Sequence, residues 1–152
     1  DKLKEDSTYS YEEAKANAPE GWRLPTDEDW KKLERAMGMS QGDADAMGFR
    51  GTMEGTLLQQ DVTGTGIALP LGGYAIVLGR PTTLRFRHWR EFGYFWTATE
   101  EKNETPFPDA YYRKISFRSS QIERGITRIV DSNYETNYPK HMSVRYVRDA
   151  VD

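Results

Sequence analysis

Cysteine is absent from all 152 residues of this chain. Disulfide bonds, thiolate nucleophiles, cysteine-based zinc sites and iron–sulfur clusters are therefore excluded together. The absence does not fix a cellular compartment, because proteins without disulfides occur on both sides of a membrane. The first conclusion is negative: no function that depends on a thiol is available to this chain.

Histidine is nearly absent too, since only His88 and His141 occur. Neither belongs to an H-x-x-x-H or H-E-x-x-H string, and no acidic string has the spacing of an EF-hand. We interpret both histidines as surface or packing residues. We therefore expect no tightly bound metal and no cofactor.

Long apolar runs and a strong charge of one sign are also missing. No run approaches the roughly 18 residues that would span a bilayer, and the formal net charge is −3. This pattern predicts no transmembrane segment in this chain and no general attraction to nucleic acid or anionic lipid. The chain begins at Asp1 without a signal peptide, so we expect a targeting segment, which could carry a lipid anchor, on a precursor.

The residues that are present indicate a folded globular protein. Apolar residues make up 37% and aromatic residues 12% of the chain, whereas disordered chains are poor in aromatic residues. The length fits a single domain over 1–152. Residues 1–9 are highly charged, and we expect them to form a flexible leader.

Two capping boxes predict two helices in the N-terminal part of the chain. Ser10 is followed three residues later by Glu13, and Thr26 is followed three residues later by Asp29; in this pattern the two side chains satisfy each other's free backbone N–H groups. The second helix carries an apolar stripe of Trp30, Leu33 and Met37, and Gly38 would end it. A short helix is expected at 43–47, followed by loop.

The pattern changes to short strands from Ile67 onward. These strands are rich in β-branched and aromatic residues, and we place them at 67–69, 72–78, 84–88, 94–99, 110–117, 122–130 and 143–147. A hairpin turn is expected at 118–121. Because helices come first and strands later, the sequence predicts an α+β domain with antiparallel sheets.

Four strings now become informative together because of their order. They are GWRLPTDEDW at 21–30, LGGY at 71–74, GYFWTAT at 93–99 and SVRYVRD at 143–149. This order resembles the Fibrobacter succinogenes major paralogous domain, a family of bacterial envelope proteins whose pattern reads roughly CPxGWxLPTxxEW, GG-aromatic, aromatic-WS(S/T)T and SVRCV(K/R)D. The resemblance implies a C-type-lectin-like fold with two N-terminal helices and two small antiparallel sheets. It covers most of 11–149, and the family's N-terminal strand looks short or absent here.

The chain departs from this family pattern at two places. Ala18 and Tyr146 stand where the family often has cysteine. If those cysteines pair in relatives, the resemblance implies that Ala18 and Tyr146 lie side by side, with the final strand near the first helix.

The residues inside the shared motifs are interpreted as structural. They are Trp22, Leu24, Pro25, Thr26, Asp29, Trp30, Trp96 and Arg145. Large aromatic residues such as these contribute much of the buried area of a core. Asp29 is expected to cap its helix, and Arg145 to pair with a carboxylate or with loop carbonyls near that helix, because a buried charge needs a partner. The rival interpretation is that Arg145 lines a ligand pocket, since its fork suits carboxylates and sugars alike.

Two activities that occur on related folds do not fit the sequence. Sulfatase-modifying, formylglycine-generating enzymes carry a similar RLPTExEW string but act through cysteines, so their chemistry is excluded here and we predict that the chain is not an enzyme. Calcium-dependent lectins use Glu-Pro-Asn or Gln-Pro-Asp, and the nearest string, at 107–109, reads Phe-Pro-Asp. We therefore assign no calcium site and no other metal site.

The leading hypothesis is a non-catalytic binding module of the bacterial cell envelope, at the outer surface or in the periplasm, secreted or lipid-anchored. Its partner would be a glycan or a protein. Recognition residues are expected in the loops 80–89 and 131–142, where function commonly lies. The candidates for stacking on or hydrogen-bonding a sugar are Trp89, Asn133, Tyr134, Asn137 and Tyr138.

Alternatives remain at this point. The chain could be a structural or assembly component of a surface lipoprotein or fimbria-like complex, or an enzyme with an unrecognised carboxylate pair. The basic–aromatic stretch 80–90 could also bind single-stranded nucleic acid by stacking and charge. We favour a β-ribbon with arginines on its solvent face, because the total charge is acidic.

Overall fold

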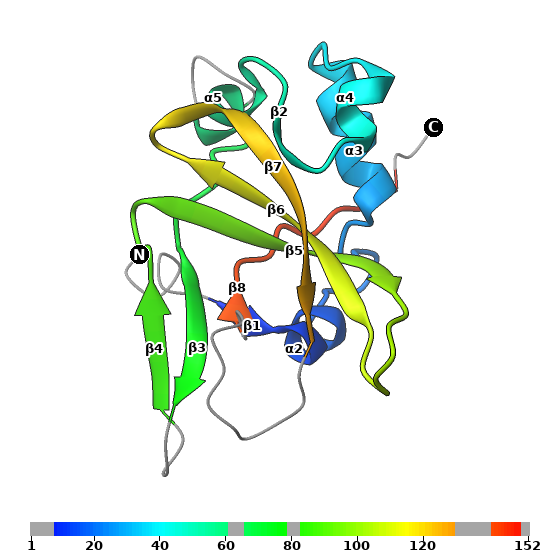
Figure 1. Ribbon diagram of the computed structural model, residues 1–152, viewed down its shortest axis with the longest axis vertical. Helices are drawn as coiled ribbons and strands as arrows, with labels where there is room; N and C mark the ends of the chain where they lie inside the picture. The colour runs from blue at the N-terminus through cyan, green and yellow to red at the C-terminus, as the bar shows by residue number, and fades with distance from the viewer. Residues whose placement is uncertain (1–7, 61–65, 79–82, 130–140, 150–152) are drawn as a thin grey trace.

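The computed structural model describes residues 8–60, 66–78, 83–129 and 141–149 (Figure 1). Its elements follow the chain as β1 (Tyr9–Ser10), α2 (Tyr11–Ala16), α3 (Asp27–Ala36), α4 (Gln41–Asp45), β2 (Gly48–Arg50), α5 (Glu54–Gln59), β3 (Tyr74–Leu78), β4 (Thr83–Arg87), β5 (Phe92–Glu101), β6 (Asp109–Ser116), β7 (Ser119–Arg128) and β8 (His141–Met142). Within this described part, no helix is long and apolar enough to cross a membrane.

The strands form two four-stranded antiparallel sheets, so the predicted α+β class is confirmed. Their orders are β1-β8-β3-β4 and β2-β7-β6-β5. Single parallel bridges, Gly73 with Gly93 and Phe95 with Ser143, connect the two sheets through β5. In Figure 1, α3 and α4 lie together on one side of the second sheet, and the β3–β4 hairpin projects from the rest of the molecule.

Both capping boxes form as the sequence predicts. The Ser10 hydroxyl accepts from the Glu13 N–H and the Glu13 carboxylate accepts from the Ser10 N–H, and Thr26 and Asp29 repeat the pattern at the start of α3. The helix α3 ends at Ala36, and Gly38 follows with φ +113°. That left-handed conformation is one that glycine adopts without strain.

Alternation along β5 divides the core into two clusters. Phe95 packs with Trp30, Leu58 and Ile115 on the α3 side. Its neighbour Trp96 faces the other way, into a cluster with Tyr11, Ala14, Leu24 and Met142. Successive strand residues point to opposite faces, so one strand supplies both cores and fixes α2 and α3 on opposite sides of the sheet.

Several predicted elements differ in the structure. The stretch 67–69 is not a strand, and the segment expected to be loop after α4 contains β2 and α5. The last regular strand is β8 at His141–Met142, whereas the expected strand 143–147 makes only single bridges at Ser143 and Val147. Among the described residues four helices, α2 to α5, precede β3, whereas the sequence predicted two N-terminal helices and a short helix at 43–47, which corresponds to α4. The two-residue β1 comes before them. These elements depend on pairing with distant segments, which local pattern does not encode.

Trp22 is the motif aromatic that does not enter the core. Its side chain is 40% exposed, and the guanidinium carbon of Arg148 lies 5.0 Å from its ring centre. Trp30 and Trp96 are buried as expected. Trp22 follows a turn that begins at Pro19, whose carbonyl accepts from the Trp22 N–H at 2.9 Å, and this turn lies outside both clusters.

Candidate functional site

Buried ion pairs attach α3 to the second sheet. They thereby position the residues at the N-terminal end of α3. Glu34, on the inner face of α3, has no solvent exposure. Arg50 of β2 donates to both of its carboxylate oxygens at 2.6 and 2.8 Å, and the Nε of Arg113 on β6 donates at 2.9 Å. Three buried charged side chains from three elements therefore pair with one another, although the Arg50 Nε has no acceptor among the described residues.

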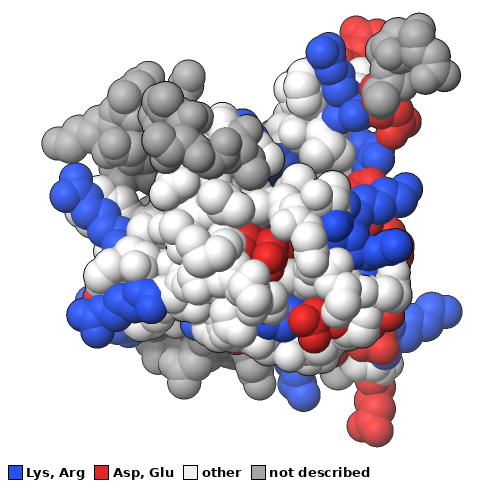
Figure 2. All heavy atoms as spheres, turned by 90° about the horizontal axis from the view of Figure 1, so that it is seen from above, with Lys and Arg blue, Asp and Glu red and all other residues white. Residues whose placement is uncertain are grey.

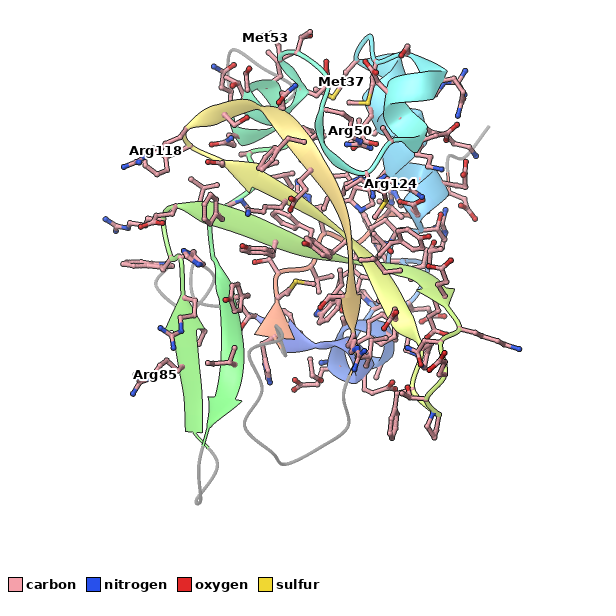
Figure 3. All side chains as sticks on the ribbon, in the orientation of Figure 1. Met37, Arg50, Met53, Arg85, Arg118 and Arg124 are labelled. Carbon is pink, nitrogen blue, oxygen red and sulfur yellow. The ribbon has the colours of Figure 1, made fainter. Side chains whose placement is uncertain are left out.

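A second part of this network surrounds Asp27 in the first turn of α3. Arg113 donates to Asp27 at 2.6 Å, and Arg124 of β7 donates at 2.8 Å. Burial acts to raise the pKa of Asp27, but the hydrogen bond from Arg124 and the charge and hydrogen bond of Arg113 outweigh it, so the pKa falls to about 2. In Figure 3, Arg50 and Arg124 point into the space between the helices and the sheet, whereas Arg85 and Arg118 point away.

Sequence reasoning missed this network, although a signal was present. Asp27, Lys31 and Glu34 recur at helical spacing with Trp30, and all four are buried. The apolar stripe suggested Leu33 and Met37 as the inward residues, and these are only partly buried. Charged residues at core spacing on a helix require buried partners, but the sequence could not indicate which arginines would supply them.

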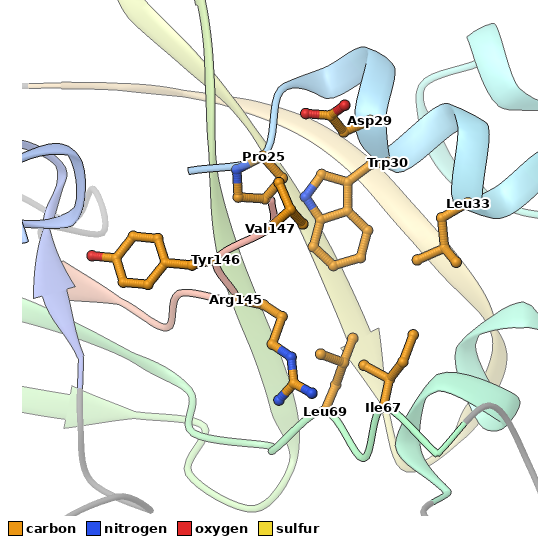
Figure 4. Close-up of a pocket in the computed structure, with 9 residues that line it drawn as sticks. All are labelled: Pro25, Asp29, Trp30, Leu33, Ile67, Leu69, Arg145, Tyr146 and Val147. Carbon is orange, nitrogen blue, oxygen red and sulfur yellow. The ribbon is translucent and has the colours of Figure 1, made fainter. Parts of the chain in front are cut away.

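The network holds α3 beside a cavity of about 250 Å³ (Figure 4). The cavity is lined by Pro25, Asp29, Trp30, Leu33, Ile67, Leu69, Arg145, Tyr146 and Val147. Two segments far apart in the sequence meet here, because Arg23 and Val147 exchange backbone hydrogen bonds of 2.7 and 2.9 Å. The first and last shared motifs thus build one site, which their separation in sequence concealed.

Asp29 caps α3 as predicted, and its carboxylate is fully engaged. It accepts from the Thr26 N–H at 2.8 Å and from both terminal nitrogens of Arg23, the second at 3.2 Å. The hydrogen bond from Arg23 is the main cause that lowers the pKa of Asp29, to about 2. Asp29 therefore has a partner, and that partner is Arg23 rather than Arg145.

Arg145 does not have the buried ion pair that the sequence suggested. Its side chain is exposed, and no described residue forms a hydrogen bond or an ion pair with it. Asp29, the acidic residue of the first motif in the cavity wall, is paired with Arg23, and the Arg145 guanidinium lies beside Leu69 instead (Figure 4). The rival interpretation, in which Arg145 lines a pocket, agrees with its position in the cavity wall.

Trp30 adds an unsatisfied group to this cavity. Its side chain is 4% exposed, and its indole Nε1 is buried without a hydrogen-bond acceptor among the described residues. In Figure 4 the indole nitrogen faces Pro25 and Val147 on one side of the cavity.

Tyr146 places the C-terminal segment against the first helix. Its hydroxyl donates to the Ala14 carbonyl at 2.8 Å, and its ring packs against the cluster of Tyr11 and Ala14. The expectation that this segment lies near α2 is confirmed. The contact falls one helical turn before Ala18, the residue that the resemblance paired with Tyr146.

Trp89 is the one sugar-binding candidate that lies within the described residues. Its side chain is 45% exposed and borders a hollow of about 270 Å³ with Pro70, Leu71 and Arg90. The guanidinium carbon of Arg90 lies 4.4 Å from the centre of the Trp89 ring. The other candidates, Asn133, Tyr134, Asn137 and Tyr138, lie outside the described residues.

The backbone around Trp89 is strained and tightly held. His88 and Arg90 both have positive φ, 58° and 65°, a conformation that non-glycine residues adopt at a cost. The Arg90 N–H donates to the Leu71 carbonyl at 2.8 Å, and the Phe92 N–H donates to the His88 carbonyl at 3.0 Å. This turn holds the Trp89 backbone in one conformation. Within the part of the chain described here, no group of three or more His, Asp or Glu residues could hold a metal ion.

The two sheets, the flanking helices and the site where the first and last motifs pair define the class: a small α+β domain in whose described part no group of three or more His, Asp or Glu residues could hold a metal ion. The family model described as the Fibrobacter succinogenes major domain matches residues 4–148. The chain therefore belongs to this family, as its motifs suggested. No curated protein and no solved structure matches it significantly.

Proposed function

We propose that this chain is a non-catalytic binding module of the bacterial cell envelope, with a glycan or a protein as its ligand and a C-type-lectin-like fold as its scaffold. Its place would be the outer surface or the periplasm, and its precursor would carry the export signal or lipid anchor. Family membership over residues 4–148 supports the scaffold. The lack of cysteine supports a binding role, because the thiol chemistry of formylglycine-generating enzymes is impossible here.

The observation that carries the proposal is the exposed Trp89 on its strained turn. Two non-glycine residues with positive φ flank it, and each such residue costs roughly 1–3 kcal/mol. Because the Trp89 indole is 45% exposed, the free energy gained by burying it offsets little of this strain. Strain that does not serve the core is typical of a functional site. The indole offers an apolar stacking surface, and Arg90 offers a fork of hydrogen-bond donors beside it, which is the combination a glycan needs.

The test is a glycan array followed by calorimetry on any sugar that binds. Trp89→Ala should abolish binding while leaving the melting temperature unchanged, because the side chain lies outside the core clusters. Phe117→Ala is the matched control, since Phe117 is also exposed, at 53%, and lies on a different turn. Retained binding in Trp89→Ala, or no glycan bound by the parent protein, would contradict this site.

A second candidate function is that of an assembly component of a surface complex. Exposed apolar side chains at one end of the molecule favour it. The segments at this end, β2, α5 and the β6–β7 turn, carry exposed Phe49, Met53 and Phe117. Figure 2 shows this end as a largely uncharged surface that includes a few acidic side chains, with charged side chains of both signs around it. Exposed apolar patches of this kind commonly mark contacts between proteins.

The two functions separate experimentally through different side chains. If the chain is an assembly component, Phe117→Glu should prevent cross-linking of the protein into a larger complex on cells, and Trp89→Ala should not. If it is a glycan-binding module, the two variants should behave in the opposite way in the binding assay. Fractionation of cells that express the full precursor tests the envelope location: recovery only from the cytoplasm would refute it.

A further inference from the structure

Among the described residues, the cavity beside α3 is lined mostly by apolar groups, with one charged side chain that has no partner. Its apolar lining residues are Pro25, Trp30, Leu33, Ile67, Leu69 and Val147. The charged residues in its wall are Asp29 and Arg145. Asp29 already accepts hydrogen bonds from Arg23 and from the Thr26 N–H, so within the described lining Arg145 supplies the charge that remains available to a ligand.

Arg145 is placed to receive an anion. Figure 4 shows its side chain running along the cavity wall with the guanidinium beside Leu69. Among the described residues it has neither a carboxylate nor a carbonyl partner. A guanidinium is always charged and matches a carboxylate with two parallel hydrogen bonds. An apolar cavity edged by an unpaired guanidinium therefore favours a ligand with an apolar body and a carboxylate.

The indole of Trp30 provides an independent observation at the same cavity. Buried polar groups in folded proteins almost always have a partner, and leaving one without a partner costs roughly 1–3 kcal/mol. The Trp30 Nε1 is buried without one, and Trp30 lines the cavity. Such a donor is explained if its acceptor arrives with a ligand.

We infer that this cavity is a second binding site, separate from Trp89, for a small apolar carboxylate that Arg145 holds by its charged end. The volume of about 250 Å³ lies just below the roughly 300–1,000 Å³ typical of ligand pockets, so the apolar body is the size of one aromatic or branched side chain. The carboxylate belongs either to a free acid or to the C-terminal residue of a peptide. The two sources share the same chemistry at Arg145.

Calorimetric titration of the whole chain with 3-phenylpropionate, and with its neutral amide, tests the inference. The acid should bind and the amide should bind at least roughly 10-fold more weakly, since a hydrogen bond to a charged group contributes about 1.5–3 kcal/mol. The same comparison with acetyl-Leu-Phe and its C-terminal amide identifies the source: binding of the peptide acid alone assigns a peptide terminus, and binding of phenylpropionate alone assigns a free acid. Amides that bind as well as acids, or no binding of any acid at millimolar concentration, would overturn the inference.

Three variants separate the roles of charge, cavity and fold. Arg145→Met should weaken acid binding roughly 10-fold or more with no change in melting temperature, because no residue in the described part of the chain pairs with Arg145. Arg148→Met is the matched control: Arg148 is also exposed on the C-terminal segment but contacts Trp22, and its loss should leave binding unchanged. Leu33→Phe should fill the cavity and block the acid without altering charge.

The indole N–H resonance of Trp30, assigned with Trp30→Phe, provides a readout at the cavity itself. It should shift when the acid binds and should not shift in Arg145→Met at the same acid concentration. A large fall in melting temperature in Arg145→Met would show that the arginine is structural and would refute the inference. Because Trp89→Ala should leave acid binding intact, failure of this site and failure of the glycan site can be distinguished.

Discussion

Arg113 is the residue whose removal tests the buried network most directly. Its side chain has no solvent exposure, and it donates to Glu34 at 2.9 Å and to Asp27 at 2.6 Å. The substitution Arg113→Met keeps much of the side chain's length and removes the charge. Glu34 is then left fully buried with Arg50 as its one remaining cationic partner.

The expected loss of stability is large for a single substitution. Removing one partner of a buried ion pair costs about 3–5 kcal/mol, because the other charge stays buried without full compensation. For a domain of this size each kcal/mol lowers the melting temperature by about 2–4 °C, so a fall of roughly 6–20 °C is expected. Circular dichroism melts and urea titrations at neutral pH measure both quantities.

The control is Arg118→Met, since Arg118 is exposed at the β6–β7 turn and points away from the molecule (Figure 3). It should change stability by less than about 0.5 kcal/mol. A triple variant in which Arg113 and Arg50 become Met and Glu34 becomes Leu should recover part of the loss, because well-packed apolar groups can replace a buried ionic set. Wild-type stability in Arg113→Met, or a triple variant less stable than the single one, would refute the reasoning.

Four further outcomes follow from individual contacts. The pKa of Asp27 is lowered from 3.8 to about 2 in the folded protein. Because the folded pKa is the lower one, the ionised carboxylate contributes about 2 kcal/mol of stability above about pH 4, and this contribution is lost as the pH falls toward 2. The difference in stability between wild type and Asp27→Asn, measured in urea, should therefore shrink between pH 4 and pH 2. Gly73→Ala should destabilise the protein strongly in a thermal melt, since Gly73 has φ +65° and its added Cβ would lie 2.0 Å from the Arg87 carbonyl oxygen. Thr26→Ala removes the cap of α3 and should cost about 1 kcal/mol in urea unfolding. Tyr146→Phe removes the hydrogen bond to α2 and should cost roughly 1 kcal/mol in the same assay.

Each of these has a result that would count against it. A stability difference for Asp27→Asn that is constant between pH 5 and pH 2 would mean that the carboxylate does not titrate as described. If Gly73→Ala had the melting temperature of the wild type, the backbone at residue 73 would not lie as close to the Arg87 carbonyl as described. If Thr26→Ala or Tyr146→Phe were neutral, then water would replace those hydrogen bonds without loss.

The sequence determined the local features of this protein. Capping boxes at Ser10 and Thr26 fixed the starts of α2 and α3, since a cap is formed by residues three positions apart. Alternating apolar and aromatic residues located β5, β6 and β7 to within a few residues, because strand side chains have a period of two. The order of four short motifs was enough to establish the family.

Only the tertiary structure decided how distant residues are paired. Glu34 looked like any charged residue on a helix, and its partners Arg50 and Arg113 come from strands far along the chain. Arg145 looked like a buried, paired residue, but in the structure Asp29 pairs with Arg23, and Arg145 is exposed at a cavity. Which charged residues pair in the interior depends on how the fold brings distant segments together, and the local spacing of residues carries no information about it.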